Sequence, residues 1–426
     1  MATKKTCIFC GNEYESDDKS VILFKSASAE DGSVRICSHC INKCHELYAN
    51  KMAKERAAAV ENKPIEMTPV QVKAKLEEWV LDQEVAVKQV AREYYNHLKR
   101  LKRFDLDNEA NEKLRIDKSN MIYMGPTGSG KTEVVRALSS LMDLPYVIED
   151  SSSFTSSGYV GRDVDEILKD LLDAADGDIE KAQKGIVFLD EIDKIKKTSG
   201  GKNGKDVGGE AVQQALLRLV EGGTHKVIKN KQMGTTIDFN TDNVLFIAGG
   251  AFVGLEKIIA NRVNKQSGKS NVGFGAALAA EQEANFNELI LQVKPEDLME
   301  FGLIPEMLGR FPVLVPFKEL SVDTLKNILT EPKHAIIKQF KEMYMFDSEV
   351  ELIFTEGALT ELATRAKEKK IGARGLRSVI EETLADVGFE YPSIEGLTKI
   401  IINDDLSHQY ILKEENIELD DIEDME

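Results

Sequence analysis

A complete phosphate-binding loop occupies residues 125–132, which read Gly-Pro-Thr-Gly-Ser-Gly-Lys-Thr. The apolar segment 121–124 precedes the loop, and the segment 133–142 that follows has helical periodicity. Between a strand and a helix, such a loop turns successive backbone N–H groups toward a phosphate, and the helix adds its positive end. The alternative is a glycine-rich turn without a ligand, but the Gly-Lys-Thr ending and both flanks argue against it. The sequence therefore predicts that this chain binds a nucleoside triphosphate.

Each part of this loop has an expected role. The glycines allow the tight turn, Lys131 reaches the outer phosphates, and the hydroxyl of Thr132 ligates magnesium. The predicted ATP-binding residues here are Gly125, Pro126, Thr127, Gly128, Ser129, Gly130, Lys131, Thr132 and Glu133.

A second nucleotide element spans residues 185–191, where an apolar run ends in Asp190 and Glu191. This pattern predicts a buried parallel strand whose carboxylates lie at its C-terminal edge, where α/β sheets bind ligands. Asp190 is suited to hold Mg²⁺ through water, and Glu191 to polarise the attacking water. Asp193 is expected to be a first-turn helix residue instead of a third catalytic acid. With a third strand at 244–248, these segments outline a parallel sheet of an α/β fold.

All five cysteines fall within the first 44 residues, and four of them form two Cys-x-x-Cys pairs. Two such pairs complete a tetrahedral Zn²⁺ site, whereas unliganded or redox cysteines are the alternative. Short strands are expected between the pairs, at 21–24 and 34–36. The predicted zinc ligands are Cys7, Cys10, Cys37 and Cys40, and the competing ligands outside the paired spacing are His39, Cys44 and His45.

Length and charge limit the possible classes. A chain of 426 residues exceeds one ordinary core, so two or three domains are expected. The absence of a long apolar run argues against a membrane span, and the N-terminus lacks a secretory stretch, so a cytoplasmic location is expected. The formal charge of −18 argues against a nucleic-acid binder, which would present a basic face.

Beyond the phosphate loop, four segments occur in the order seen in the ClpX family of AAA+ protein unfoldases: 158–161 (Gly-Tyr-Val-Gly), 189–194 (Leu-Asp-Glu-Ile-Asp-Lys), 302–306 (Gly-Leu-Ile-Pro-Glu) and 372–377 (Gly-Ala-Arg-Gly-Leu-Arg). With the leading cysteine module, the chain resembles that family over essentially its whole length. The resemblance implies an AAA+ P-loop domain with a parallel sheet, a smaller, mainly helical C-terminal α+β domain and an N-terminal zinc-binding module. It also implies a homo-hexamer that uses ATP to unfold tagged or unfolded protein substrates and feeds them to the ClpP peptidase. Neither a Gly-x-Ser-x-Gly nor a His-Glu-x-x-His motif occurs, so no intrinsic peptidase is expected.

The resemblance assigns further roles at the nucleotide. Arg310 matches the arginine finger that reaches into a neighbouring subunit's site, and Arg374 matches the second sensor of the small domain. Val80 and Leu81 lie where the family packs the adenine ring. Asp82 departs from the pattern, because a glycine usually stands there.

The resemblance also assigns the contacts with protein partners. Tyr159 and Val160 match the first pore loop that grips substrate, Val207 lies in the place of the second, and Arg162 departs from the usual acidic residue in a way expected to alter the charge of the pore. The segment 224–240 matches a pore-entrance loop but lacks the family's Arg-Lys-His triplet. Adaptor proteins and dimerisation through the zinc module are further expectations. The residues matching the peptidase-docking loop are Val272, Gly273 and Phe274.

The expected organisation has five parts. They are a zinc-binding module (1–50), a linker (51–68), a large α/β ATPase domain (69–319), a small C-terminal domain (320–414) and an acidic tail (415–426). Helices are expected at 325–344, 356–370 and 376–387, and strands at 400–402 and 410–412. Two rival functions stay open from the sequence: a nucleic-acid motor with a zinc module, and a remodelling chaperone that acts without a peptidase.

Overall fold

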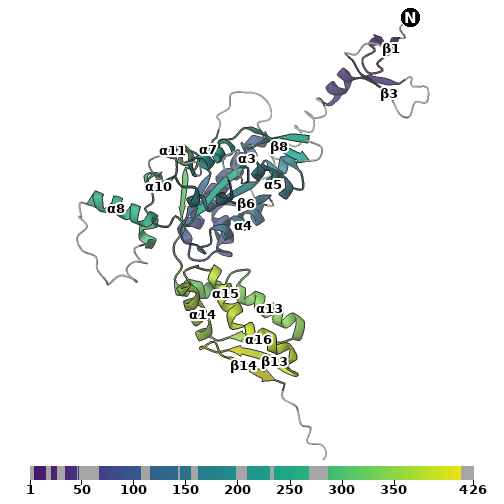
Figure 1. Ribbon diagram of the computed structural model, residues 1–426. Helices are drawn as coiled ribbons and strands as arrows, with labels where there is room; N and C mark the ends of the chain where they lie inside the picture. The colour runs from purple at the N-terminus through teal and green to yellow at the C-terminus, as the bar shows by residue number, and fades with distance from the viewer. Residues whose placement is uncertain are drawn as a thin grey trace, which may run out of the picture. The chain divides into compact units, whose positions relative to one another are not determined.

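The computed structural model describes residues 4–15, 21–25, 34–45, 47, 67–106, 116–142, 144–154, 162–197, 209–230, 235–267 and 286–413 (Figure 1). The chain divides into two compact units. The first comprises residues 1–66 and 98–115, and the second comprises residues 67–97 and 116–426.

The first unit contains two small antiparallel ladders. Strand β1 (Lys4–Thr6) pairs with β2 (Glu13–Glu15), and β3 (Leu23–Lys25) pairs with β4 (Arg35–Cys37). The latter two strands begin one or two residues later than the sequence predicts. Residues 38–45 are helical, so the second cysteine pair lies where a strand meets a helix.

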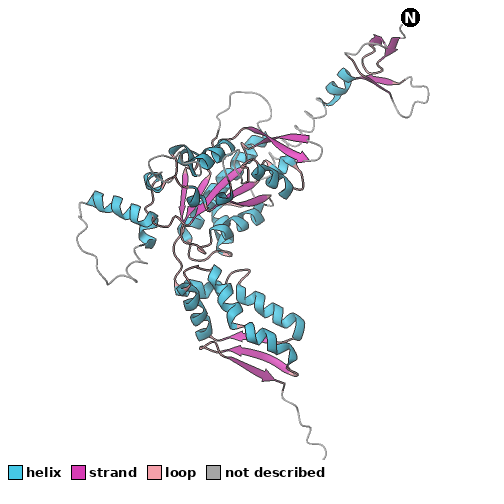
Figure 2. Ribbon diagram, in the orientation of Figure 1, coloured by secondary structure: helices cyan, strands magenta, loops and turns pink. Residues whose placement is uncertain are grey.

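The second unit is built around a parallel sheet with the strand order β11-β5-β10-β7-β6 (Figure 2). The strands predicted at 121–124, 186–189 and 244–248 form its centre, whereas the two edge strands were not predicted. The strands are β5 (Met121–Met124), β6 (Tyr146–Asp150), β7 (Ile186–Asp190), β10 (Leu245–Gly250) and β11 (Val313–Pro316).

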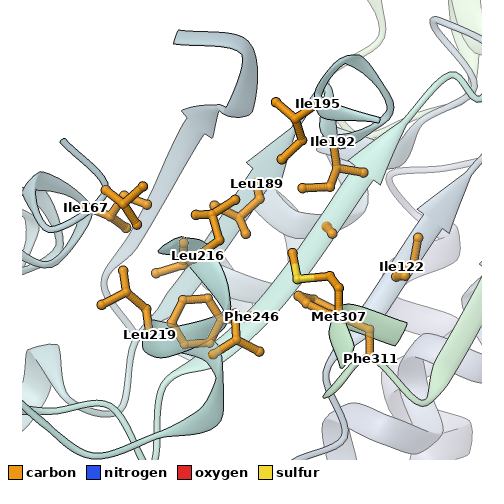
Figure 3. Close-up of a cluster of buried hydrophobic side chains, with 14 of the residues drawn as sticks. Ile122, Ile167, Leu189, Ile192, Ile195, Leu216, Leu219, Phe246, Met307 and Phe311 are labelled. Carbon is orange, nitrogen blue, oxygen red and sulfur yellow. The ribbon is translucent and has the colours of Figure 1, made fainter. Parts of the chain in front are cut away.

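The central strands are buried on both faces, as their unbroken apolar runs predict. Alternate side chains point to opposite faces of a sheet. One set (Ile122, Leu189 and Phe246) packs with apolar residues of α5, α7 and α11 in the core of Figure 3. The other set includes Tyr123, whose ring lies 6.2 Å from Phe188 and 5.2 Å from Phe317.

Helices and short elements surround this sheet. The segment 224–240, expected as a loop, is a β-hairpin instead, with β8 (Thr224–Asn230) antiparallel to β9 (Thr235–Asn240). The α-helices are α2 (Pro69–Glu77), α3 (Glu84–Leu106), α4 (Lys131–Met142), α5 (Glu166–Ala174), α6 (Ile179–Ala182), α7 (Gly209–Glu221), α8 (Leu255–Ser267), α10 (Pro295–Phe301) and α11 (Pro305–Arg310), and the 3₁₀ turns are η1 (Ser151–Ser153) and η2 (Ile192–Ile195). Residues 286–290 are also helical.

A second apolar core begins at Leu320. The single helix expected at 325–344 is two helices, because Pro332 lies between them and a proline does not continue a helix. The expected helix at 376–387 is likewise divided. The elements are α12 (Val322–Thr330), α13 (Ile336–Ser348), α14 (Glu356–Glu368), α15 (Arg374–Thr383), α16 (Ala385–Glu390), η3 (Tyr391–Ser393), β12 (Glu351–Phe354), β13 (Leu397–Ile402) and β14 (His408–Leu412).

Strand β12 was not predicted. It pairs in parallel with β13, which pairs antiparallel with β14. The helix-rich C-terminal part is therefore an α+β domain beside the parallel α/β sheet, which confirms the predicted fold class. Within the described residues, no helix is both long and apolar enough to cross a lipid bilayer.

Candidate functional site

The phosphate loop connects the end of β5 to the start of α4. Gly125 and Gly128 have φ values of 153° and 75°, which L side chains rarely adopt. A Cβ atom at Gly128 would collide with the carbonyl oxygen of Ile371, and one at Gly125 would collide with that of Phe317. The glycines therefore allow both the backbone turn and the close approach of neighbouring segments.

The Lys131 side chain closes this loop on itself. Its Nζ donates to the carbonyl oxygens of Gly125 and Pro126, each at 2.7 Å. Burial lowers the pKa of Lys131 to about 8, an effect that the nearby Asp190 opposes. The Ser129 Oγ is buried and lacks a hydrogen-bond partner within the described part of the chain. A donor left unpaired in such a loop fits a phosphate oxygen as its missing acceptor.

The acidic pair stands at the carboxyl end of β7. The Asp190 Oδ1 accepts from the backbone N–H of Glu191 at 2.9 Å. Glu191 is exposed and has a left-handed backbone with φ 55°, a sparsely populated conformation that is often found at functional sites. Asp193 is buried in the first turn of η2, where its carboxylate accepts from the N–H groups of Ala251 and Phe252 at 3.3 Å each. Asp193 thus holds the ends of β7 and β10 together.

A cavity of about 680 Å³ lies over the loop and the acidic pair. Its wall includes the following residues predicted to bind or process nucleotide: Val80, Leu81, Thr127, Gly128, Ser129, Gly130, Lys131, Thr132, Glu133, Asp190, Glu191 and Arg374. Gly125 and Pro126 are not among the lining residues, and their carbonyl oxygens accept hydrogen bonds from the Lys131 Nζ. The sequence did not point to other lining residues, which include Trp79, Leu320, Ile328, His334, Ile336 and Gln339.

The small domain completes the cavity. The backbone N–H of Ala373 donates to the Gly128 carbonyl at 3.1 Å, so the phosphate loop contacts the segment that precedes α15. Arg374 is the first residue of α15, and its charge helps to lower the pKa of Lys131. Arg377 pairs instead with Glu381 at 3.5 Å and donates to Gln339 at 3.3 Å, which is a structural role.

Arg310 lies apart from this cavity. It is the last residue of α11, its side chain is 52% exposed, and its Nη2 lies 3.0 Å from a carboxylate oxygen of Glu221. It does not line the cavity of its own chain. Among the described residues, Glu221 is the one ion-pair partner of this guanidinium. Such surface pairs are weak, so the guanidinium can contact another molecule.

The cysteine cluster forms a separate candidate metal centre. The Sγ atoms of Cys7, Cys10, Cys37 and Cys40 all lie within 4.8 Å of one another. The Cys10 and Cys37 sulfurs are 3.9 Å apart, close to the edge of a tetrahedron with Zn–S bonds of about 2.3 Å. Burial raises the pKa of Cys7, but backbone N–H groups outweigh it and lower the pKa to about 6, which favours a thiolate. The donor set therefore fits Zn²⁺.

Known proteins resemble this chain along nearly its whole length. Residues 116–314 match the family model of an AAA domain (Cdc48 subfamily), and residues 320–399 match that of the C-terminal, D2-small domain of ClpB protein. The chain is 41% identical over 408 residues to the ATP-dependent Clp protease ATP-binding subunit ClpX of Treponema denticola. The aligned region covers 93% of this chain and 92% of that protein. The chain belongs to the ClpX family.

Two further relatives agree. The ClpX of Azotobacter vinelandii is 40% identical over 397 residues, with 92% of this chain and 87% of that protein covered. ClpX 3 of Methylococcus capsulatus is 38% identical over 416 residues, with 95% and 92% covered. Membership confirms the resemblance inferred from the motifs, and the chain is an AAA+ ATPase. Nucleotide and Mg²⁺ follow from this. Thr132 and Asp190, the predicted magnesium residues, both line the cavity, and their role stays a prediction.

The predicted pore residues Tyr159, Val160 and Val207 lie outside the described residues, as do Val272, Gly273 and Phe274 of the predicted docking loop. Their roles stay predictions.

Arg162 lies among the described residues, and its side chain has several partners. Its guanidinium pairs with Glu149 and Asp170, and its Nε lies 3.4 Å from Glu166. The group also lies over the Phe154 ring, 5.6 Å from the centroid. Three carboxylates surround this positive charge, so Arg162 links β6 to α5. Its effect on the charge of a pore stays a prediction.

Proposed function

We propose that this chain assembles into a homo-hexameric ring that unfolds protein substrates with the energy of ATP hydrolysis and translocates them into the ClpP peptidase. It is the ATP-dependent unfoldase subunit of a Clp protease and carries no peptidase of its own. We place it in the cytoplasm, with adaptor proteins and dimerisation acting through the zinc-binding module.

One observation carries this proposal. The cavity joins a phosphate loop, the acidic pair of β7 and the small domain's Arg374 in one wall. The small domain forms part of this wall, so cleavage of the bound triphosphate can move the small domain relative to the α/β domain. That movement would supply the mechanical work of unfolding. The ClpX relatives, named as ATP-binding subunits of a Clp protease, support the peptidase partner.

The residues divide the hydrolysis step between them. The loop amides and Lys131 would hold the phosphates, Thr132 and Asp190 would hold Mg²⁺, and Glu191 would orient the attacking water. Magnesium supplies charge neutralisation at the phosphates. Arg310 would act from the neighbouring subunit and Arg374 from the same chain.

The test is degradation of a tagged, stably folded reporter by this chain with ClpP and ATP. Glu191→Gln should keep the ATP dissociation constant within about twofold while lowering kcat at least about a hundredfold, because only water activation is lost. Glu395→Gln, an exposed position far along the sequence from the loop, serves as the matched control and should match the native protein.

Three outcomes would count against the proposal or favour a rival function. A native ring that hydrolyses ATP but leaves the reporter folded and intact would remove the unfoldase function. DNA-stimulated ATPase activity with a steep salt dependence would favour a nucleic-acid motor. Reporter unfolding by a chain that does not co-migrate with ClpP would favour a free-standing chaperone, whereas co-migration that Phe274→Ala abolishes would support the peptidase partner.

A further inference from the structure

The segment 78–83 forms one side of the nucleotide cavity and is also tied to the small domain. Val80 and Leu81 line the cavity. The carbonyl of Glu78 accepts from the backbone N–H of Lys333 at 3.0 Å. The Trp79 and His334 rings meet edge to face, with centroids 5.1 Å apart. The side of the cavity formed by residues 78–83 therefore contacts the small domain, at the connection between α12 and α13.

Asp82 adds a side-chain bond to this connection. Its Oδ2 accepts from the Thr324 hydroxyl at 2.9 Å. Thr324 is buried in the first turn of α12, where its backbone N–H donates to the Ser321 Oγ at 3.0 Å. The carboxylate thus lies against the N-terminal end of a helix, where a negative charge is favourable.

The backbone of Asp82 shows why the usual glycine can be replaced here. Its φ is 57°, in the left-handed region that glycine adopts freely and that aspartate tolerates better than most residues. A glycine at this position would keep the turn but could not make the bond to Thr324. The departure from the family pattern therefore adds a contact between domains.

Gln83 connects the same segment to the phosphate loop. This buried side chain donates from Nε2 to the carbonyls of Ser129 at 3.3 Å and Lys318 at 2.9 Å. Its Oε1 accepts from the Lys318 N–H at 2.9 Å. Lys318 lies between β11 and α12, in the chain segment that joins the two cores. A shift of α12 is consequently transmitted to both sides of the cavity.

We propose that Asp82 is a positioning residue that links nucleotide binding to the orientation of the small domain through its bond to Thr324. This inference rests on the proposed nucleotide site. The bond holds α12 where Ile328, Ile336 and Arg374 can complete the cavity wall. When it is broken, the domain arrangement that binds nucleotide is less populated, and the apparent affinity falls by the same factor.

The experiment measures binding of N-methylanthraniloyl-ADP and the steady-state ATPase of the full chain. Asp82→Gly removes the carboxylate without backbone strain, so it should fold normally, weaken binding about tenfold and raise KM for ATP about tenfold with kcat within about twofold. The expected tenfold loss is at the low end of the range for a hydrogen bond to a charged group, because Asp82 is exposed. Asp82→Asn keeps an acceptor and tolerates the turn, and should recover most of the loss.

The partner is tested in the same way. Thr324→Val should match Asp82→Gly, Thr324→Ser should match the native protein, and the double variant Asp82→Gly with Thr324→Val should be no weaker than either single variant. Thr364→Val, which removes a hydroxyl that bonds only within α14, is the matched control and should have no effect.

Native affinity in Asp82→Gly, or additive losses in the double variant, would overturn the link. These outcomes are separate from the fate of the proposed function. The link is measured by nucleotide binding, whereas the unfoldase function fails only if the native protein cannot unfold the folded reporter.

Discussion

Replacing Arg162 by alanine removes the cation that neutralises a buried carboxylate. The Glu149 side chain on β6 is only 4% exposed, whereas Arg162 is 31% exposed. Glu166 and Asp170 share the same guanidinium and are 44% and 38% exposed. In the variant Arg162→Ala, Glu149 stays buried without its partner while two other carboxylates remain close by.

The expected loss of stability follows from this burial. Removing one partner of a buried ion pair lowers the free energy of unfolding by about 3–5 kcal/mol. Because Arg162 is partly exposed, the expected loss is about 3 kcal/mol. For a domain of this size, each kcal/mol lowers Tm by about 2–4 °C, so the transition of the α/β domain should fall by about 6–12 °C. Scanning calorimetry without nucleotide measures this shift directly.

A matched arginine provides the control. Arg365 pairs with Glu361 at 2.8 Å on the surface of α14, with exposures of 50% and 39%. Arg365→Ala should cost less than about 0.5 kcal/mol, because solvent screens exposed pairs. Adding Glu149→Gln to Arg162→Ala should restore part of the lost stability, since it removes the uncompensated charge.

The pH dependence gives an independent check. Burial raises the pKa of Glu149, and Arg162 opposes this rise. When folding raises the pKa of a carboxyl group, that group adds to the free energy of unfolding at a pH below its ordinary pKa. This stabilisation is lost as the pH rises through the pKa of the folded state. Without Arg162 the pKa of Glu149 rises further, so the stability deficit should grow as the pH rises above the ordinary pKa of a glutamate. A deficit equal to that of Arg365→Ala, or one that does not change with pH, would refute the reasoning.

Two further predictions concern the nucleotide and zinc sites. Because burial lowers the pKa of Lys131 to about 8 and bound phosphates would raise it, nucleotide binding should take up protons near pH 8, with affinity falling as the pH rises further. Calorimetric titration in two buffers of different ionisation enthalpy measures the uptake, and equal heats in both would contradict it. Cys7→Ser should deprive the purified full chain of its zinc in elemental analysis, whereas Cys44→Ser should retain it; equal zinc in both variants would argue against the four-cysteine site.

The elements that the sequence predicted well are those whose chemistry is local. The phosphate loop, the acidic pair after β7 and the two cysteine pairs each depend on residues a few positions apart, so their spacing carries the information. The central strands β5, β7 and β10 are continuous apolar runs, and both faces of each are buried.

Other elements lacked such a signal. Strand β6 reads Tyr-Val-Ile-Glu-Asp and has an exposed edge position, and β12 is only four residues long, so neither stands out by composition. The hairpin of β8 and β9 is polar along much of its length. Their strand conformation depends on hydrogen bonds to partner strands, and a single segment does not encode its partner.

Residue order alone was enough to identify a triphosphate-binding loop, a carboxylate pair and four thiols, because those groups act through neighbours in the chain. The three-dimensional fold decided which distant residues close the cavity. It placed Trp79 against His334, attached Asp82 to Thr324 and enclosed Arg162 among three carboxylates. Those partners are separated by up to 255 positions or lie on different elements, and only the packing of the cores brings them within bonding distance.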